Sequence, residues 1–249
     1  MRVAIVSDIH GNLPALEAVV RDIGRRGVDT VVNLGDSLSG PLLPLQTAQF
    51  LMAQDWTHLG GNHERQVLDL DPLRADPNDA FTRSELGAGE LAWLAGLAPR
   101  LQYCPEMLLC HGTPDSDHRY LLETVTPTQL RRASQTELDA RLGVVAAELV
   151  ACGHSHVPRA MRASTGQLVV NPGSVGQQAF DDDLPYPHTV ESGSPDARYA
   201  IVERQAGQWS TSLVAVPYAF QAMVALARSR GRHDWACLLG CGRWPAARG

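Results

Sequence analysis

The chain has 249 residues, of which 44% are hydrophobic and 19% charged, as in folded globular proteins rather than disordered ones. All 21 basic residues are arginines, which excludes Schiff-base chemistry, a phosphate-binding loop of the G-x-x-x-x-G-K-[ST] kind and the strand lysine of protein kinases. The net charge is −6, whereas duplex-binding proteins usually carry an excess of basic residues, so long nucleic acid is not expected as a partner.

Up to about residue 152, short apolar runs alternate with stretches of helical periodicity. Asn12 is expected to cap the first helix, with Pro14 in its first turn and Leu16 and Val19 on its apolar face. The alternation predicts an α/β layered fold with parallel pairing. The predicted strands are 3–6, 30–34, 56–59, 101–103, 107–110 and 148–152. The predicted helices are 12–26, 43–52, 90–97 and two polar helices within 127–143.

The pattern changes in the last third of the chain. Residues 159–163 with 167–170, and 199–204 with 209–216, predict two β-hairpins, so two sheets are expected to share one core. The segment 181–198 has five acidic residues and three prolines without periodicity, which predicts a long loop, either a surface loop or a lid. A helical tail is expected over about 218–249, and residues 1–249 are expected to form one domain.

Five predicted strands run directly into loops that contain metal-ligating residue types. In open α/β sheets, binding sites form at the carboxyl ends of the strands, so these loops are expected to converge on one crevice. The loops are Asp8-Ile9-His10, Gly35-Asp36, Gly60-Gly61-Asn62-His63-Glu64, His111-Gly112 and Gly153-His154-Ser155-His156.

The residue types in these loops favour metal chemistry. Aspartate, asparagine and histidine without a thiolate suit Mn²⁺, Fe or Zn²⁺, and seven candidate ligands are too many for one tetrahedral ion. Each motif alone has a plain structural explanation, since Asp36 fits a helix cap and His111 a buried histidine. Their conjunction at five strand ends favours two ions that share a bridging carboxylate.

In this order, the five motifs resemble those of the calcineurin-like metallophosphoesterases. Residues 171–176, Asn-Pro-Gly-Ser-Val-Gly, resemble the small bacterial phosphodiesterase branch, and the resemblance covers about residues 1–216. It implies a four-layer α-β-β-α sandwich of two mixed sheets flanked by helices. The resemblance implies that one metal is bound by Asp8, His10 and His156, and the other by Asn62, His111 and His154. It implies that Asp36 bridges both metals. It also implies that His63 stabilises the phosphate or protonates the leaving group.

The sequence departs from the superfamily pattern at one place. Phosphoprotein phosphatases of this superfamily have a second aspartate three residues after the bridging one, which orients the catalytic histidine, and an arginine just beyond it. Here these places hold Ser39 and Gly40. The departure argues against a phosphoprotein phosphatase and leaves open what orients His63.

Together these features predict a dinuclear metal-dependent phosphodiesterase in which a hydroxide held between the ions attacks a small-molecule or nucleotide ester. Manganese is the first candidate metal, with iron or zinc as alternatives. A phosphomonoesterase, a dinucleoside polyphosphate hydrolase and a non-catalytic interaction scaffold on the same fold are the competing hypotheses. The N-terminal apolar run is too short for a signal peptide and the five cysteines form no framework, so a cytoplasmic protein with reduced thiols is expected.

Overall fold

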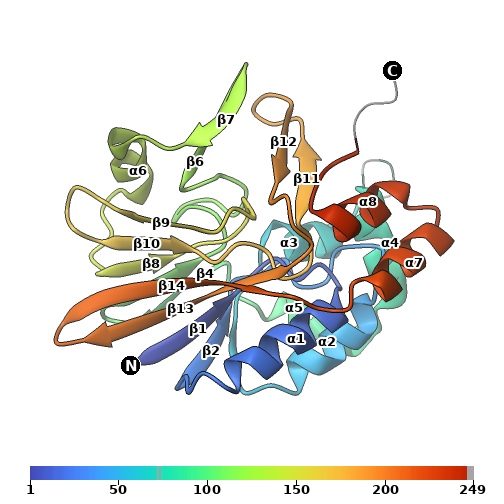
Figure 1. The fold of residues 1–249 in the computed structure, drawn as a ribbon, viewed down its shortest axis with the longest axis horizontal. Helices are drawn as coiled ribbons and strands as arrows, with labels where there is room; N and C mark the ends of the chain where they lie inside the picture. Colours follow the sequence, from blue (N-terminus) through green and yellow to red (C-terminus); the bar gives the residue numbers. More distant parts are fainter. Residues whose placement is uncertain (72, 74, 246–249) are drawn as a thin grey trace.

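The computed structural model describes residues 1–71, 73 and 75–245. Two five-stranded mixed sheets pack face to face, with helices on their outer sides (Figure 1). The first sheet has the order β14 (Gln208–Val216), β13 (Ala197–Gln205), β1 (Arg2–Val6), β2 (Thr30–Asn33) and β3 (Thr57–His58). The second has the order β4 (Arg100–Cys104), β5 (Met107–Cys110), β8 (Leu149–Ala151), β10 (Leu168–Asn171) and β9 (Arg159–Arg162).

Strand β1 shows how the layers are joined. Its side chains alternate between the two faces of the sheet, so Val3 and Ile5 pack in the core between the sheets while Ala4 and Val6 pack against the helices. Helices α1 (Leu13–Ile23) and α2 (Pro44–Met52) cover that outer face, and α6 (Gln135–Leu142) covers the second sheet. The predicted four-layer arrangement is confirmed.

Helix α1 begins as the sequence predicts. The side chain of Asn12 accepts a hydrogen bond from the backbone N–H of Ala15 at 3.3 Å, and Pro14 occupies the first turn. Leu16 and Val19 are fully buried beneath the helix. This helix starts immediately after the Asp8–His10 loop, so its cap fixes where that loop ends.

The loop predicted over 181–198 is wrong. Strands β11 (Ala179–Asp182) and β12 (His188–Glu191) pair there as an antiparallel hairpin, and β13 begins at Ala197. Buried Val190 and half-buried Phe180 anchor the hairpin, and its tip contains Asp183, Pro185 and Pro187.

The first of the two helices predicted within 127–143 is also wrong. Strands β6 (Glu123–Thr126) and β7 (Gln129–Arg132) form a second hairpin there, and only α6 is helical. Pro127 lies in the turn of the hairpin, where Thr126 Oγ1 accepts the backbone N–H groups of Thr128 and Gln129. Both hairpins stand out from the sheets on the same side of the molecule, with β12 in contact with β7 (Figure 1).

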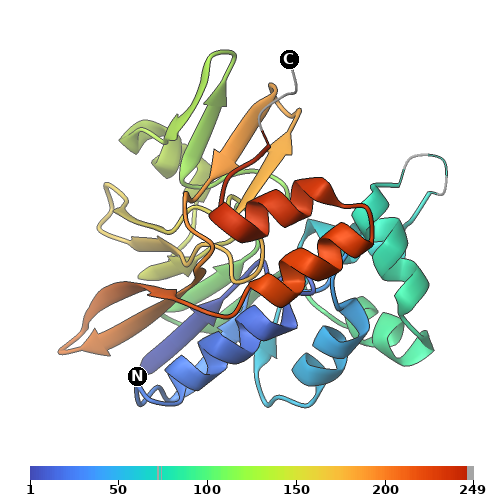
Figure 2. The same ribbon diagram turned by 45° about the vertical axis from the view of Figure 1, so that its right-hand side comes forward.

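Between β3 and β4 lie three short helices, α3 (Asn62–Leu68), α4 (Pro77–Glu85) and α5 (Ala88–Ala95), of which only α5 was predicted. At the C-terminal end, α7 (Gln221–Ser229) and α8 (His233–Cys241) pack on each other (Figure 2), in a cluster that also contains Leu42 and Ala179. Residues 246–249 of the predicted helical tail lie outside the described residues. Within the described ranges, no helix combines the length and hydrophobicity needed to cross a membrane.

Candidate metal centre

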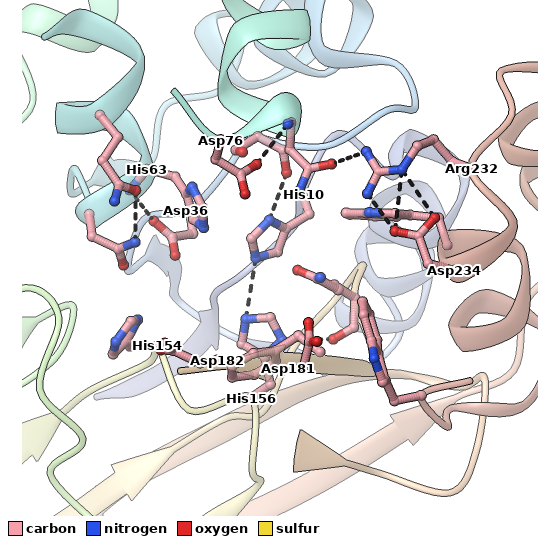
Figure 3. Close-up of a pocket in the computed structure, with 18 residues that line it drawn as sticks. His10, Asp36, His63, Asp76, His154, His156, Asp181, Asp182, Arg232 and Asp234 are labelled. Atoms are coloured by element: carbon pink, nitrogen blue, oxygen red, sulfur yellow. Dashed lines mark hydrogen bonds and ion pairs between the residues drawn. The ribbon is translucent and has the colours of Figure 1, made fainter. Parts of the chain in front are cut away.

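The five motif loops meet at the carboxyl ends of β1, β2, β3, β5 and β8. Strand β2 runs parallel to both β1 and β3, and β5 runs parallel to β8, so within each sheet these ends lie at one edge. The structure brings together the seven residues predicted as metal ligands. Figure 3 shows four of them, His10, Asp36, His154 and His156, with His63 nearby. The convergence that the sequence predicts is therefore observed.

The backbone at these positions has an uncommon conformation. Across the described ranges, six non-glycine residues have a positive φ, and five of them are candidate ligands: Asp8 (56°), His10 (50°), Asp36 (52°), His154 (66°) and His156 (55°). Such residues are uncommon in folded chains and cluster at functional sites, where the surrounding structure holds them. The loops are thus shaped to direct these side chains into one place.

Asp8, His10 and His156 form the first group of candidate ligand atoms. The Nε2 atoms of the two histidines lie 3.2 Å apart, and His156 Nε2 lies 3.3 Å from Asp8 Oδ1. The Nδ1–H groups donate to backbone carbonyls, His10 to Ser39 at 2.7 Å and His156 to Gln177 at 2.8 Å. These bonds fix both rings with Nε2 facing the group, which is how metal-binding histidines are oriented in proteins.

Asp36, His111 and His154 form the second group. His111 Nε2 lies 3.0 Å from Asp36 Oδ2 and 3.9 Å from Asp8 Oδ1. The first group, which contains Asp8, is therefore directly adjacent to the second group. His111 Nδ1–H donates to the backbone carbonyl of Leu34 at 2.9 Å. The ring of His111 is therefore held in the same way as those of the first group.

Two buried oxygens of the candidate ligands, Asp8 Oδ1 and Asn62 Oδ1, have no hydrogen-bond partner among the residues that the structure describes. Asn62 orients its side chain by donating from Nδ2 to Gln66 Oε1 at 3.1 Å. Leaving such atoms buried and unpaired costs about 1–3 kcal/mol each. Because carboxylate and amide oxygens and a neutral imidazole nitrogen are metal ligands, the residues present fit a pair of divalent transition-metal ions.

Protonation equilibria in the site follow from burial and from the two carboxylates. Burial lowers the pKa of both His10 and His154 to about 3, so each ring keeps a lone pair for a cation. Burial opposes protonation of His111 too, but the charge of Asp36 and their hydrogen bond raise its pKa to about 9. The carboxylate of Asp36 thus favours a positive charge at this point of the site.

Glu64 holds the loop that carries Asp36. Its buried carboxylate accepts the backbone N–H groups of Asp36 and Ser37, each at 2.8 Å, and that of Gly61 at 2.7 Å. A Cβ atom at Gly61 would collide with the side chains of Asp36 and His111, so only glycine allows this close approach. Glu64 joins the second and third motif loops into one unit.

His63 lies at the start of α3, directly after Asn62. Its backbone N–H donates to Asp36 Oδ1 at 3.0 Å, and its ring centroid lies 5.4 Å from that of His10 in an edge-to-face arrangement. The side chain is 24% exposed and lines the cavity above the two groups. His63 therefore belongs to neither group but borders both.

A profile of the calcineurin-like phosphoesterase superfamily domain matches residues 1–190 of the chain. The chain belongs to the calcineurin-like phosphoesterase superfamily. This confirms the resemblance found in the motifs and identifies the protein as a hydrolase of phosphoesters, with the divalent-metal dependence of that superfamily.

Similar proteins are found in bacteria and archaea. An uncharacterised protein of Methanocaldococcus jannaschii is 25% identical over 205 residues, which are 70% of this chain and 76% of that protein. A metallophosphoesterase from Sphaerobacter thermophilus has the same fold, with a TM-score of 0.74 and 24% identity, covering 97% of this chain and all of that one. A hypothetical protein from Pyrococcus horikoshii gives a TM-score of 0.73 at 18% identity, covering 98% of this chain and 99% of that one.

The calcineurin-like centre contains one residue that the sequence did not point to. Asp79 of α4, only 2% exposed, accepts a hydrogen bond from His63 Nδ1–H at 2.8 Å. Ser39 Oγ donates to the same oxygen at 2.6 Å. Ser39 stands where phosphoprotein phosphatases have the orienting aspartate, so here the carboxylate comes from another helix. The Asp-Pro pair at 76–77, which starts α4, is the sequence signal that would have located this helix.

Asp36 and Asp79 also set the protonation of His63. Burial opposes the imidazolium, but the charge of Asp36, followed by the hydrogen bond and charge of Asp79, raises the pKa of His63 to about 10. The ring is thus a proton donor at neutral pH. Because Nδ1 is occupied by Asp79, Nε2 is the atom left for a ligand in the cavity.

A cavity of about 370 Å³ opens over the metal groups. Its floor is made by the motif loops, and its outer wall comes from the later part of the chain (Figure 3). Two hydrogen bonds join the end of the β11–β12 hairpin to the segment after α8. The carbonyl of Gly242 accepts from Gly193 N at 2.9 Å, and Trp244 N donates to Glu191 Oε1 at 2.8 Å. The outer wall comprises Phe180, Asp181 and Asp182 of β11, Arg232, Asp234 and Trp235 at the start of α8, and Trp244 after that helix.

Proposed function

We propose that the protein is a dinuclear metal-dependent phosphodiesterase that hydrolyses a small-molecule or nucleotide phosphoester. The observation that carries the proposal is the pair of adjacent ligand groups, with the buried oxygens Asp8 Oδ1 and Asn62 Oδ1 that find no hydrogen-bond partner within the described residues. The proposed ligands are Asp8, His10 and His156 for one ion, Asn62, His111 and His154 for the other, and Asp36 between them.

The division of Asp36 between two ions is supported by its position. Asp36 groups with His111 and His154, and its charge also acts on His10 of the first group. When bound, two divalent ions would lower the pKa of water towards about 7 and neutralise charge on a phosphoryl group. The buried carboxylates and imidazoles of the floor would hold and orient such ions.

His63 has the position and the protonation of a general acid. Asp79 holds Nδ1, so the Nε2–H group is left to donate a proton to the oxygen of the departing alcohol. Ser39 in turn restrains Asp79. A non-catalytic scaffold would have no use for this chain of three side chains, which favours the enzyme over the scaffold hypothesis.

Three further assignments belong to the proposal. Manganese is the proposed metal, because the mixed oxygen and imidazole set suits it. Cytoplasmic location stays a prediction from the sequence. One domain over residues 1–249 is supported by β13 and β14, which return late in the chain to pair beside β1.

The experiment is metal reconstitution. Protein stripped with a chelator is given Mn²⁺, Fe²⁺, Zn²⁺, Mg²⁺ or Ca²⁺ separately, and hydrolysis of bis(p-nitrophenyl) phosphate is compared with that of p-nitrophenyl phosphate. We expect two equivalents of bound metal and a higher kcat/KM for the diester, with Mn²⁺ the best ion. A preference for the monoester would replace the diesterase by a phosphomonoesterase, and a folded protein that binds no metal would refute the proposal.

A further inference from the structure

The outer wall of the cavity has an unusual combination of groups for an enzyme that binds phosphate. Two aromatic rings of this wall lie close to the first metal group: the ring of half-buried Phe180 lies 4.6 Å from that of His156, and the ring of Trp235, which is only 1% exposed, lies 6.3 Å from that of His10. The carboxylates of Asp181 and Asp182 come from the same strand as Phe180 and face the cavity (Figure 3). An ester held above the two groups would have Phe180 and the carboxylates of Asp181 and Asp182 as neighbours on this side of the cavity.

The only arginine of this wall in the described chain is not free to bind an anion. Arg232 Nη2 donates to Asp234 Oδ2 at 2.6 Å, and Nε donates to Oδ1 of the same carboxylate at 3.0 Å. Its Nη1 donates to Asn78 Oδ1 at 2.5 Å. With its charge neutralised by Asp234, Arg232 offers little to a second phosphate, as a dinucleoside polyphosphate would need.

Asp181 and Asp182 leave the wall with a negative charge. Neither carboxylate forms an ion pair with the part of the chain that the structure describes. Partial desolvation by the neighbouring residues, followed by the charges of Asp183, Asp234 and Asp182, raises the pKa of exposed Asp181. A positive charge in the cavity near these carboxylates would relieve their repulsion, and the ring of Phe180 on the same strand would add a cation–π contribution.

We propose that the substrate is a phosphodiester in which one alcohol group carries an ammonium or quaternary ammonium charge. This inference rests on the proposed function, because the metal groups hold the phosphate. The metal floor binds the anionic phosphate, and the outer wall binds the cation at the other end of the same small molecule. The acidic net charge of the wall selects against esters whose second group is anionic.

The test compares two chromogenic diesters that differ only in one atom and its charge. One is p-nitrophenyl phosphocholine, and the other is p-nitrophenyl 3,3-dimethylbutyl phosphate, in which a neutral carbon replaces the quaternary nitrogen. Both release p-nitrophenolate, so the leaving group is constant. With the manganese-loaded protein, we expect kcat/KM to be about tenfold higher for the cationic ester, the order expected for one cation near two carboxylates and one aromatic ring.

Variants of the wall locate the effect. In the double variant Asp181→Asn with Asp182→Asn, the shape and the acceptor oxygen for Leu184 N are kept, and the ratio of the two kcat/KM values should fall towards one. Asp183→Asn is the matched control, because Asp183 is exposed in the same hairpin but does not line the cavity. This control should keep the wild-type ratio.

The outcomes separate the two proposals. If both esters are hydrolysed at equal kcat/KM, or if the double variant keeps the preference, the inference is overturned while the phosphodiesterase stands. If neither ester is cleaved with any metal, the proposed function itself fails. Binding of a third equivalent of Mn²⁺ that the double variant loses would show that the wall takes a metal ion, which also overturns the inference.

Discussion

The floor and the outer wall of the cavity are built in different ways. The floor residues lie in tight loops at strand ends, where backbone carbonyls of Ser39, Leu34 and Gln177 hold three histidine rings. The wall consists of side chains from a two-stranded hairpin and a C-terminal helix, with exposed Asp181 among them. A floor held by backbone carbonyls would keep the proposed ligands in place, while side chains of the wall could be exchanged without moving those ligands.

The largest expected effect is on the amount of bound metal, which should fall in a floor variant and stay unchanged in a wall variant. Asp36→Asn keeps an acceptor for His63 N but removes the charge that attracts cations to both groups. We expect the variant to bind less than one equivalent of manganese and to lose activity by about 10³-fold or more. Elemental analysis of dialysed protein measures the first effect, and circular dichroism controls for folding.

The matched wall variant for this comparison is Asp182→Asn, which makes the same chemical change on the other side of the cavity. It should retain two equivalents of metal. If the wall variant also lost metal, the distinction between floor and wall would break down.

A smaller effect is expected where a residue acts through His63. Asp79→Asn removes the charge behind the general acid, so kcat should fall by about 10–100-fold with KM and metal content little changed, a smaller loss than that of His63→Ala. Because Asp79 raises the pKa of His63, and the acid must be protonated to act, the alkaline limb of the kcat profile should move to lower pH.

Ser39→Ala is the graded companion of this variant, since it removes only one hydrogen bond to Asp79. Its kcat should lie between those of the wild type and Asp79→Asn. An unchanged pH profile in Asp79→Asn would mean that Asp79 supports the fold and does not position His63.

The smallest expected effect is on the free energy of unfolding and comes from His58, next to the floor loops. His58 contacts Asn33, whose Nδ2 also donates to Ser37 Oγ in the loop of Asp36. Burial lowers the pKa of His58 to about 4 from its ordinary 6.5, so its neutral form stabilises the fold above pH 6.5. As the pH falls from 6.5 to 4, the unfolded chain takes up a proton that the folded chain refuses, and the free energy of unfolding drops.

His58→Gln should remove this contribution, which is about 2 kcal/mol. Urea unfolding at pH 7 and pH 4.5, with a chelator in every sample, should show a smaller drop for the variant than for the wild type. His118→Gln, at an exposed histidine, serves as control and should behave like the wild type. Equal drops in all three proteins would contradict the prediction.

The same division between floor and wall explains what the sequence could predict. The floor follows from local rules: short apolar strands such as Met107–Cys110 end in ligand residues, and parallel pairing brings their ends together. Asp79 does not follow from such rules, because a buried aspartate in a polar helix looks like a surface residue until His63 and Ser39 are placed beside it. Tertiary contact alone defines its role.

The two hairpins were missed for a related reason. In β6–β7, Pro127 fits a first helical turn as well as a hairpin turn, and pairing of Val125 with Leu130 decides between them. In β11–β12, strands of four residues are too short for a clear alternation, and packing of Phe180 on His156 fixes the hairpin. The wall is therefore specified by long-range contacts that a linear pattern does not contain.

The left-handed backbone of the five candidate ligands determines which substitutions at these positions would stabilise the fold. At about 1 kcal/mol each, these conformations cost in sum about 5 kcal/mol, comparable to the net stability of a small domain. Glycine at the same positions would relieve that cost and abolish the ligands. The centre is thus a local conflict between folding and chemistry, so we expect a lineage released from catalysis to replace His10, His154 and His156 by glycine or asparagine and to gain stability.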